Sequence, residues 1–342
     1  MAAAARFFER LGPLSAGDLA ALCQAEITGD AALEVGDVNT PDQAGPGELF
    51  FLAKGAPAPA SASGACAIVA DAETASGLEG PAAVLIARDP RAAFGRACGA
   101  LLRVREHEGA DFVHDSAEVD ASARIAPGAV VGQGARIGAD AVIGAGAVIG
   151  PGVVIGARTH IGARVVVRCA VLGADVEILS GAVIGEAGFG LAQDAGGLLS
   201  MPQVGAVVIE DEVVIGANST VDRGMIRDTR LRKACKIDNL CHIAHNCDIG
   251  EYAVMAAFCG VSGSVSVGRG VQFGGRAGVA DHLRIGDGAR LAAFAGVMKH
   301  VPDGETWAGS PAQPIQRFMR ETVWLRRQSA ARGRGKLKKD GS

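Results

Sequence analysis

Aliphatic residues recur every six positions along most of the chain, and this period restricts the fold more than any other feature. A period of six is neither the 2 of a strand nor the 3.6 of a helix, and it is typical of a hexapeptide parallel β-helix. We expect each hexapeptide to form one side of a triangular coil, with its aliphatic side chain inward and a small residue at the corner. The inward residues are Val113, Val119, Ile125, Val131, Ile137, Ile143, Ile149, Ile155, Ile161, Val167, Ile178, Ile184, Ile209, Ile215, Val221, Ile237, Ile243, Ile249, Met255, Val261, Val267, Phe273, Val279, Ile285, Leu291 and Val297.

Composition agrees with a tightly turning repeat. Glycine accounts for 49 of the 342 residues, which is about double its average usage. Aromatic residues make up only 4%, fewer than an ordinary globular core would need. We therefore predict a mainly β fold: a left-handed parallel β-helix with a small N-terminal α/β domain and a C-terminal helix.

The hexapeptide pattern divides the chain into three domains. Residues 1–105 precede the pattern and predict a small α/β domain, with strands at 49–53, 67–70 and 83–86 and a loop at 54–65. A helix is expected at 89–102, because Asp89 suits its N-cap and Pro90 its first turn. Residues 106–306 form the solenoid, interrupted at 186–206 by a predicted excursion. Residues 307–342 close the solenoid and add a basic helix, expected at 315–328 and packed through Ile315, Phe318, Met319 and Trp324, followed by a basic tail.

Charge and hydropathy restrict the partners. The net charge of −4 argues against nucleic-acid binding, and we expect the basic segment 332–339 to be a solvated terminus. Arg6, Glu9 and Arg10 interrupt the apolar run that a signal peptide needs. No uncharged apolar run approaches the ~20 residues of a membrane-spanning helix. We predict a cytoplasmic protein without stable membrane insertion, whose eight cysteines are reduced.

Four cysteines fall within the repeats and suggest a metal site at first sight. Cys235, Cys241, Cys247 and Cys259 each stand two residues before an inward aliphatic residue, in a slot that elsewhere holds small residues. That position predicts small core side chains rather than metal ligands, so we expect no metal.

Three histidines avoid the inward positions. His245 and His282 are 37 residues apart, close to the 36 residues of two coils, so we expect them on the same side of the prism. Two histidines at one groove suggest acid–base chemistry; two unrelated surface histidines are the alternative. A zinc site formed by both with His242 is a further alternative. His242 and His245 straddle a corner, however, so we expect their side chains to diverge and His242 to be a bystander.

Longer motifs carry a family resemblance. The chain resembles the UDP-3-O-acylglucosamine N-acyltransferases of bacterial lipid A (lipopolysaccharide) synthesis over nearly its full length. The shared segments are GEAGFG and MPQVG of the excursion, GANSTVDRG (216–224), IDNLCHIAHN (237–246), GGRAGVADHLRIGD (274–287) and WAGSPAQP (307–314). The repeat alone is shared by many acyltransferases, whereas IDN…IAHN followed by a second histidine 37 residues on is specific.

The resemblance implies a reaction and its residues. A 3-hydroxyacyl chain would pass from the phosphopantetheine of acyl carrier protein to the 2-amine of a UDP-linked, 3-O-acylated glucosamine, in a homotrimer with sites between subunits. The protein would need no cofactor of its own. His245 matches the general base, and His282 matches a histidine that binds the nucleotide substrate. Asp238 and Asn246 match substrate-binding positions, and the Gly263 N–H is a candidate oxyanion donor.

The N-terminal domain departs from the family pattern. The family holds uracil with Phe-x-x-Asn-x-x-Tyr, and the aligned stretch here is FLAKGAP, 51–57. Phe51 is kept, but Lys54 replaces asparagine and Pro57 replaces tyrosine. We expect Lys54 to reach a phosphate or a base carbonyl.

Other readings of the function stay open. Arg317, Arg320, Arg326 and Arg327 would steer the acidic acyl carrier protein, or else form only a solvated helix face. The acyl chain would end near residues 294–298. Alternative functions are a hexapeptide acyltransferase with another amino-sugar acceptor or an acyl-CoA donor, and a zinc-dependent β-helix lyase.

Overall fold

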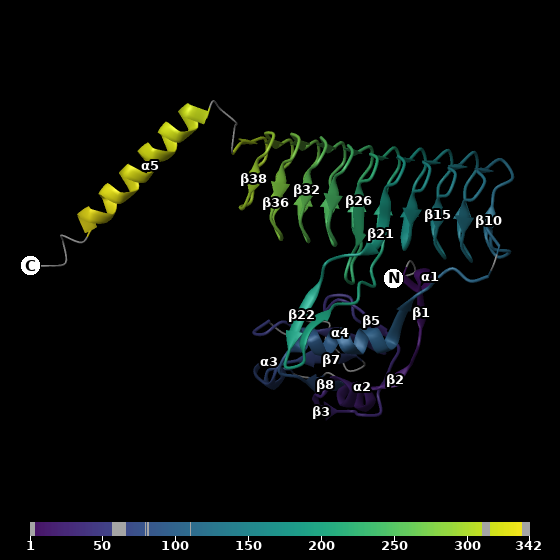
Figure 1. Cartoon of the computed structure of the whole chain (residues 1–342). Coiled ribbons are helices and arrows are strands. Elements are labelled where there is room, and N and C mark those ends of the chain that lie inside the picture. The colour runs from purple at the N-terminus through teal and green to yellow at the C-terminus, as the bar shows by residue number, and fades with distance from the viewer. Residues whose placement is uncertain are drawn as a thin grey trace, which may run out of the picture.

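The computed structural model describes residues 4–56, 66–78, 80, 82–109, 111–309 and 315–336. A long prism of stacked coils dominates it, with a small domain beneath its middle coils and a helix beyond the last one (Figure 1). Mainly β structure and stacked parallel coils confirm the predicted fold class.

Three parallel sheets form the sides of the prism, and each strand pairs with the strand one coil later. The first sheet contains β10 (Glu118–Val119), β13 (Arg136–Ile137), β16 (Val154–Ile155), β19 (Ala170–Leu172), β24 (Val207–Ile209), β27 (Thr229–Leu231), β30 (Asp248–Ile249), β33 (Ser266–Val267) and β36 (Arg284–Ile285). The second contains β11 (Arg124–Ile125), β14 (Val142–Ile143), β17 (His160–Ile161), β20 (Glu177–Ile178), β25 (Val214–Ile215), β28 (Lys236–Ile237), β31 (Val254–Met255), β34 (Gln272–Phe273), β37 (Arg290–Leu291) and β39 (Thr306–Trp307). The third contains β12 (Val130–Val131), β15 (Val148–Ile149), β18 (Val166–Val167), β21 (Val183–Ala187), β26 (Thr220–Arg223), β29 (His242–Ile243), β32 (Gly260–Val261), β35 (Gly278–Val279) and β38 (Gly296–Val297).

The predicted inward residues form the core of the prism. From Val131 to Val297 all of them are buried, while Val113, Val119 and Ile125 at the open first coil are more exposed. The glycine that follows many of them has a different role from the one expected. A Cβ at Gly144 would lie 2.6 Å from the backbone of Gly162 in the next coil, so glycine there permits close stacking. The left-handed corner residues are often not glycine, as Arg158 and Leu240 show.

The cysteines behave as the hexapeptide frame predicts. All eight are free and buried. Cys241 and Cys259 precede strands β29 and β32, which pair directly, so the two thiols stack on adjacent coils. Burial raises the pKa of Cys235 and of Cys247 to about 12. These thiols are therefore small core groups, in the slot that the frame assigns to them.

The N-terminal domain is built around a five-stranded sheet in the order β3-β8-β7-β6-β5. Its elements are α1 (Ala4–Phe7), β1 (Phe8–Arg10), β2 (Leu14–Ser15), α2 (Ala16–Cys23), β3 (Glu26–Gly29), β4 (Glu34–Val35), β5 (Asp37–Val38), β6 (Glu48–Phe51), β7 (Ala67–Ala70), α3 (Ala72–Ser76), β8 (Ala83–Ile86), α4 (Pro90–Leu101) and β9 (Leu102–Val104). The predicted strands at 67–70 and 83–86 are confirmed, and the one at 49–53 lies at 48–51. Residues 57–65 of the predicted loop lie outside the described residues.

Helix α4 confirms the predicted helix with one correction. It begins at Pro90 and ends at Leu101, and Asp89 occupies the N-cap position. The Asp89 side chain makes no capping hydrogen bond, so the expected side-chain cap is wrong. Burial of one helix face, which includes Phe94, Ala97 and Leu101, stabilises the helix instead.

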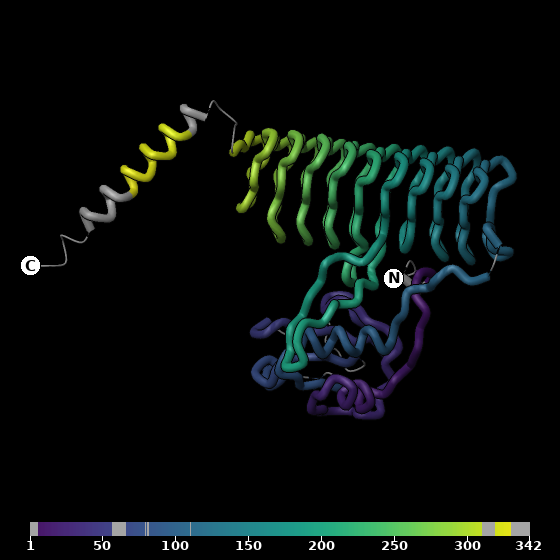
Figure 2. Tube along the Cα trace, in the orientation of Figure 1, coloured from purple at the N-terminus to yellow at the C-terminus, as the bar shows by residue number. Residues whose placement is uncertain are grey.

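The predicted excursion is confirmed as an antiparallel hairpin of β22 (Leu191–Asp194) and β23 (Gly197–Ser200). It leaves the prism after β21 and descends along α4 of the N-terminal domain (Figure 2). Arg96 of α4 forms an ion pair with Asp194 of the hairpin. The hairpin therefore connects the N-terminal domain with the middle of the prism.

The C-terminal helix is longer than predicted. Strand β39 pairs with β37 at the end of the prism, and α5 (Ile315–Lys336) extends past the expected end at 328. Met319 and Trp324 are 52% and 60% exposed, so in the single chain they do not pack as predicted. The side chains of Ile315, Arg317 and Phe318 and those of the basic tail lie outside the described residues. No helix in the described ranges is long and apolar enough to cross a membrane.

Candidate active site

A groove of about 530 Å³ lies on the third sheet, where the hairpin leaves the prism. Its walls combine polar side chains at one end with glycine and aliphatic residues at the other. The lining residues are Phe189, Asp222, His242, Ala244, His245, Gly260, Val261, Ser262, Gly263, Gly278, Val279, Ala280, Gly296, Val297 and Met298.

His245 is held between two glycines from different parts of the chain. A Cβ at Gly263, one coil later, would lie 2.7 Å from the imidazole Nε2 and Cε1. A Cβ at Gly188, in the excursion, would lie 2.7 Å from the His245 Cβ. Both positions therefore require glycine for the ring to lie where it does. Within the described chain the Gly263 N–H has no acceptor, so it is available to a bound group beside the ring.

Asn246 fixes the tautomer of His245. The Asn246 Nδ2 donates to the carbonyl of Arg227 at 2.9 Å, and its Oδ1 accepts the backbone N–H of Met225 at 3.0 Å. These two bonds settle the orientation of the amide. His245 Nδ1 lies 3.1 Å from the same Oδ1, so it must be the protonated nitrogen that donates. The lone pair of the neutral ring is therefore on Nε2, next to Gly263.

A second imidazole and a carboxylate share the groove. His242 Nδ1 lies 2.7 Å from Thr220 Oγ1, and its Nε2 lies 3.7 Å from Asp222 Oδ2. The Asp222 side chain is only 14% exposed. Burial raises the pKa of Asp222, and the positive charges of His242 and His245 oppose that rise. The expectation that His242 and His245 diverge is wrong, because both line this groove.

The apolar end of the groove is a column of glycines. His242, Gly260, Gly278 and Gly296 occupy the same outward position on successive strands β29, β32, β35 and β38. A Cβ at each of these glycines would meet nothing within 4 Å. The column is therefore a smooth trough that begins at His242 and ends beside Met298, which is 76% exposed.

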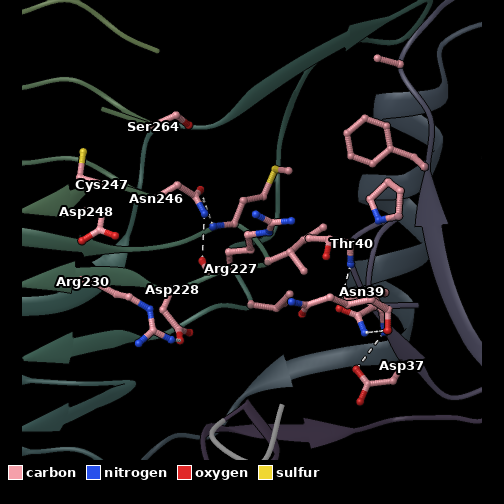
Figure 3. A pocket seen from close by; sticks show the side chains of 18 of the residues that line it. Asp37, Asn39, Thr40, Arg227, Asp228, Arg230, Asn246, Cys247, Asp248 and Ser264 are labelled. Atoms are coloured by element: carbon pink, nitrogen blue, oxygen red, sulfur yellow. Dashed lines mark hydrogen bonds and ion pairs between the residues drawn. The ribbon is translucent and has the colours of Figure 1, made fainter. Parts of the chain in front are cut away.

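A larger cavity, of about 1030 Å³, lies between the prism and the N-terminal domain (Figure 3). Phe51 lines it from the N-terminal domain, and Asn246, Asp248 and Ser264 line it from the prism. Phe51 packs on Phe94 with ring centroids 5.0 Å apart. Since His245 lines the groove and Asn246 lines this cavity, the two spaces adjoin at consecutive residues.

Three arginines line the larger cavity, and each is paired. Arg227 donates to both carboxylate oxygens of Asp42 at 2.6 Å, which links the prism to the N-terminal domain. Arg230 pairs with Asp228 at 2.9 Å. Arg232 forms two bonds of 2.8 Å to Asp248, which raise the pKa of the guanidinium. The cavity therefore presents guanidinium groups whose positions are fixed before any ligand enters.

Similarity to known proteins identifies the family. Residues 134–169 match the bacterial transferase hexapeptide (six repeats), and residues 206–239 match the hexapeptide repeat of succinyl-transferase. A UDP-3-O-acylglucosamine N-acyltransferase of Caulobacter sp. (strain K31) is 47% identical over 96% of this chain and 97% of its own length. Its namesake in Maricaulis maris (strain MCS10) is 48% identical over 98% of this chain and 99% of its own length. The chain belongs to the UDP-3-O-acylglucosamine N-acyltransferase family. It is thus an acyltransferase.

Solved structures with a related architecture include the UDP-N-acetylglucosamine acyltransferase of Francisella novicida. It is 28% identical, with a TM-score of 0.46 over 58% of this chain and 66% of its own.

The structure brings together some of the residues that the family resemblance singled out in this N-acyltransferase. His245, Asn246 and Gly263 are in contact or adjacent, and Phe51 lines the neighbouring cavity. His282 lies at the same corner as His245, since its N–H donates to the Gly263 carbonyl, but it does not line the groove. Asp238 is exposed and accepts hydrogen bonds from Asn239. Lys54 is exposed near Asp71 and outside the lining of the cavity.

Asp222 is the site residue that the sequence reasoning missed in this family member. It directly follows the inward Val221, in a slot that usually holds glycine or alanine. A carboxylate at a position that usually holds a small residue could have identified Asp222 as a candidate site residue from the sequence. In the described part of the chain, no group of three or more His, Cys, Asp or Glu side chains is arranged to hold a metal ion.

Proposed function

We propose that the protein transfers a 3-hydroxyacyl chain from the phosphopantetheine thioester of acyl carrier protein to the 2-amine of a UDP-linked, 3-O-acylated glucosamine, a step of lipid A synthesis. The observation that carries the proposal is the meeting of two cavities at His245 and Asn246. The trough suits an acyl chain, and the cavity with Phe51 and the arginines suits a nucleotide. A base at their junction would lie between donor and acceptor.

His245 is the general base of the proposed reaction. An amine gains a positive charge as it attacks a thioester, so a base must remove a proton. The Asn246 bond to Nδ1 leaves the Nε2 lone pair free for that proton. We expect the N–H of Gly263, which has no acceptor within the described chain, to donate to the oxyanion of the tetrahedral intermediate.

The acyl chain would lie in the glycine trough. Gly260, Gly278 and Gly296 leave the strand surfaces bare, so a hydrocarbon chain can contact backbone and aliphatic atoms over three coils. Burial of each CH₂ contributes about 0.8 kcal/mol. Met298, beside Gly296, is the side chain best placed to limit chain length.

The acceptor nucleotide would occupy the larger cavity. Phe51 offers a half-buried ring for stacking against uracil, and Arg227 and Arg230 offer donors for the diphosphate. Lys54 and His282 would contact the nucleotide only after their side chains turn toward it.

Assembly and donor recognition complete the proposal. We expect a homotrimer, in which a neighbouring prism covers the groove and the exposed Asp238 meets a neighbour's site. Arg320, Arg326 and Arg327 of α5 give the helix a basic surface that suits the acidic acyl carrier protein. Phosphopantetheine would enter on that partner, and the enzyme itself would need no cofactor.

The test is a transfer assay with purified protein. Two donors are compared: acyl carrier protein that carries a 3-hydroxyacyl chain, and acetyl-CoA. The acceptors are UDP-sugars with a free 2-amine. We expect transfer from acyl carrier protein, and a loss of about 10²–10⁴-fold in kcat for His245→Ala. His160→Ala, which changes an exposed histidine of β17, is the matched control. Preferential use of acetyl-CoA, or a folded His245→Ala variant with normal turnover, would contradict the proposal.

A further inference from the structure

His242 has no role in the mechanism above, although it lies at the head of the trough. It occupies the same column as Gly260, Gly278 and Gly296, and it is the first bulky side chain that an acyl chain in the trough would meet. The acyl carbon must lie near His245 and Gly263 to react. His242 lines the same groove, so we expect the sulfur attached to that carbon to lie on its side of the groove.

His242 faces one carboxylate and one other imidazole in the groove. Asp222 is the carboxylate that faces it, from β26, and β32 on its other side presents only glycine and valine at the paired positions. His245 is the other imidazole in the groove. Arg223 and Glu186 also act on Asp222, with opposite signs. Arg223 is buried and its guanidinium donates to the carbonyls of Gln203 and Gly185.

We infer that His242 is the general acid that protonates the departing sulfur, with Thr220 and Asp222 as the residues that position it. The inference rests on the proposed acyl transfer from a thioester. Thr220 Oγ1, at 2.7 Å, accepts the Nδ1–H of the imidazolium. The 3.7 Å between Nε2 and Asp222 is an ion-pair distance but too long for a hydrogen bond. The Nε2–H is therefore held in the groove without being bound by the carboxylate, and the sulfur can take it.

The step balances with two histidines. The amine nitrogen attacks the thioester carbon, its proton passes to His245 Nε2, and the oxyanion accepts the Gly263 N–H. The carbonyl then re-forms, the C–S bond breaks, and the sulfur leaves with the electron pair and takes the Nε2 proton of His242. The products are an amide and a thiol. His245 then releases one proton to water, and His242 takes one up. If His245 alone moved the proton, His242 would be dispensable.

His242→Gln tests whether His242 supplies the proton to the sulfur, because glutamine keeps the polarity of the side chain but cannot supply a proton. The donors are the same 3-hydroxyacyl chain as a thioester of pantetheine and of the more acidic thiophenol, and His160→Gln is the matched control. With pantetheine we expect kcat/KM to fall at least about tenfold. With thiophenol the defect should shrink toward that of the control, since a weakly basic sulfur needs no proton to leave.

The pH profile gives a second readout. A required acid makes activity fall as pH rises, and we expect this alkaline limb to disappear in His242→Gln. Asp222→Asn removes the anion that faces the imidazole, so kcat/KM should fall more with the pantetheine thioester than with the thiophenol thioester. Equal defects with both thiols and an unchanged alkaline limb would overturn the inference.

The inference can still be tested if the His242→Gln variant does not fold. If His242→Gln fails to fold, Thr220→Val, which keeps the side-chain shape, must show the same dependence on the leaving thiol in weaker form, and its absence refutes the inference. Failure of the wild-type protein to use any thioester would instead refute the proposed function.

Discussion

Replacing Gly263 by alanine should lower the activity, because the added methyl group would displace the imidazole ring of His245. The added Cβ would lie 2.7 Å from His245 Nε2 and Cε1, whereas ordinary contact begins at 3.4 Å, so the ring must retreat by about 0.7 Å. Gly188 also packs closely on this side chain, since a Cβ there would lie 2.7 Å from the His245 Cβ. The 3.1 Å bond from Nδ1 to Asn246 then stretches beyond hydrogen-bond range or breaks. A displacement approaching 1 Å costs about 10²-fold in rate, which corresponds to roughly 2.7 kcal/mol of transition-state stabilisation.

The control for this prediction is Gly275→Ala. Gly275 occupies the same place in its hexapeptide, two residues after the inward Phe273, but a Cβ there has only ordinary contact, 3.5 Å from the Ala257 carbonyl. Steady-state kinetics with a hydroxyacyl-acyl-carrier-protein donor give kcat and KM, and thermal unfolding checks stability. We expect a large fall in kcat for Gly263→Ala, a small change in KM and a near-normal Gly275→Ala. If the two variants have kcat values within about twofold, the ring position is not what limits the reaction.

Four further predictions concern other parts of the molecule. Asn246→Ala removes the acceptor for His245 Nδ1, so kcat should fall, while Asn246→Asp, which keeps the Oδ1 acceptor, should retain more activity in the same assay. Gly278→Leu fills the trough one coil beyond Gly260, so a panel of donors should show a shift toward shorter acyl chains, and an unchanged preference would place the chain elsewhere. Burial raises the pKa of Cys98 to about 12 and of Cys169 to about 11, so mass spectrometry should find both unalkylated in the folded protein at about pH 8, below the usual thiol pKa, and alkylated after unfolding. The neighbouring Thr40 hydroxyl and the ion pair with Arg227 lower the pKa of the Asp42 carboxyl. The ionised carboxyl therefore stabilises the fold at neutral pH, and this contribution is lost as pH falls below ~3.9, so Asp42→Asn should lower Tm near neutral pH but not in strong acid.

The scaffold followed from the sequence because one rule repeats. Within the uninterrupted runs, each inward aliphatic residue stacks on its equivalent 18 residues later, as Ile143 does on Ile161, so a single period specifies both the strand and its partner. The hexapeptide frame also explained the positions of the cysteines, and the interruption of the repeat located the excursion. It did not specify the conformation of the excursion, since the antiparallel pairing of Leu191 with Ser200 and the ion pair with Arg96 depend on contacts outside the repeat.

The site was harder to predict because its geometry depends on neighbouring coils rather than on neighbours in sequence. Spacing correctly placed His282 at the corner of His245, but not in the same groove. It suggested that His242 and His245 diverge, whereas both line one groove together with Asp222 and with Phe189 of the excursion. Asp222 is 20 residues from His242 in the sequence. It reaches His242 because extra residues after β26 lengthen this coil, so that Thr220 pairs with His242 rather than with the residue 18 positions later.

The outward column of the third sheet shows how a repeat fold acquires a site. Its inward partners remain aliphatic throughout, but the outward residue is valine in the first four strands, Val130, Val148, Val166 and Val183. It then becomes Thr220 and His242, and finally Gly260, Gly278 and Gly296. The polar pair stands where the excursion inserts, and the glycines follow it for three coils. Outward side chains do not enter the core. The residues at this outward position can therefore change from valines to a polar pair and then to the glycines of the trough, while the inward aliphatic stack stays intact.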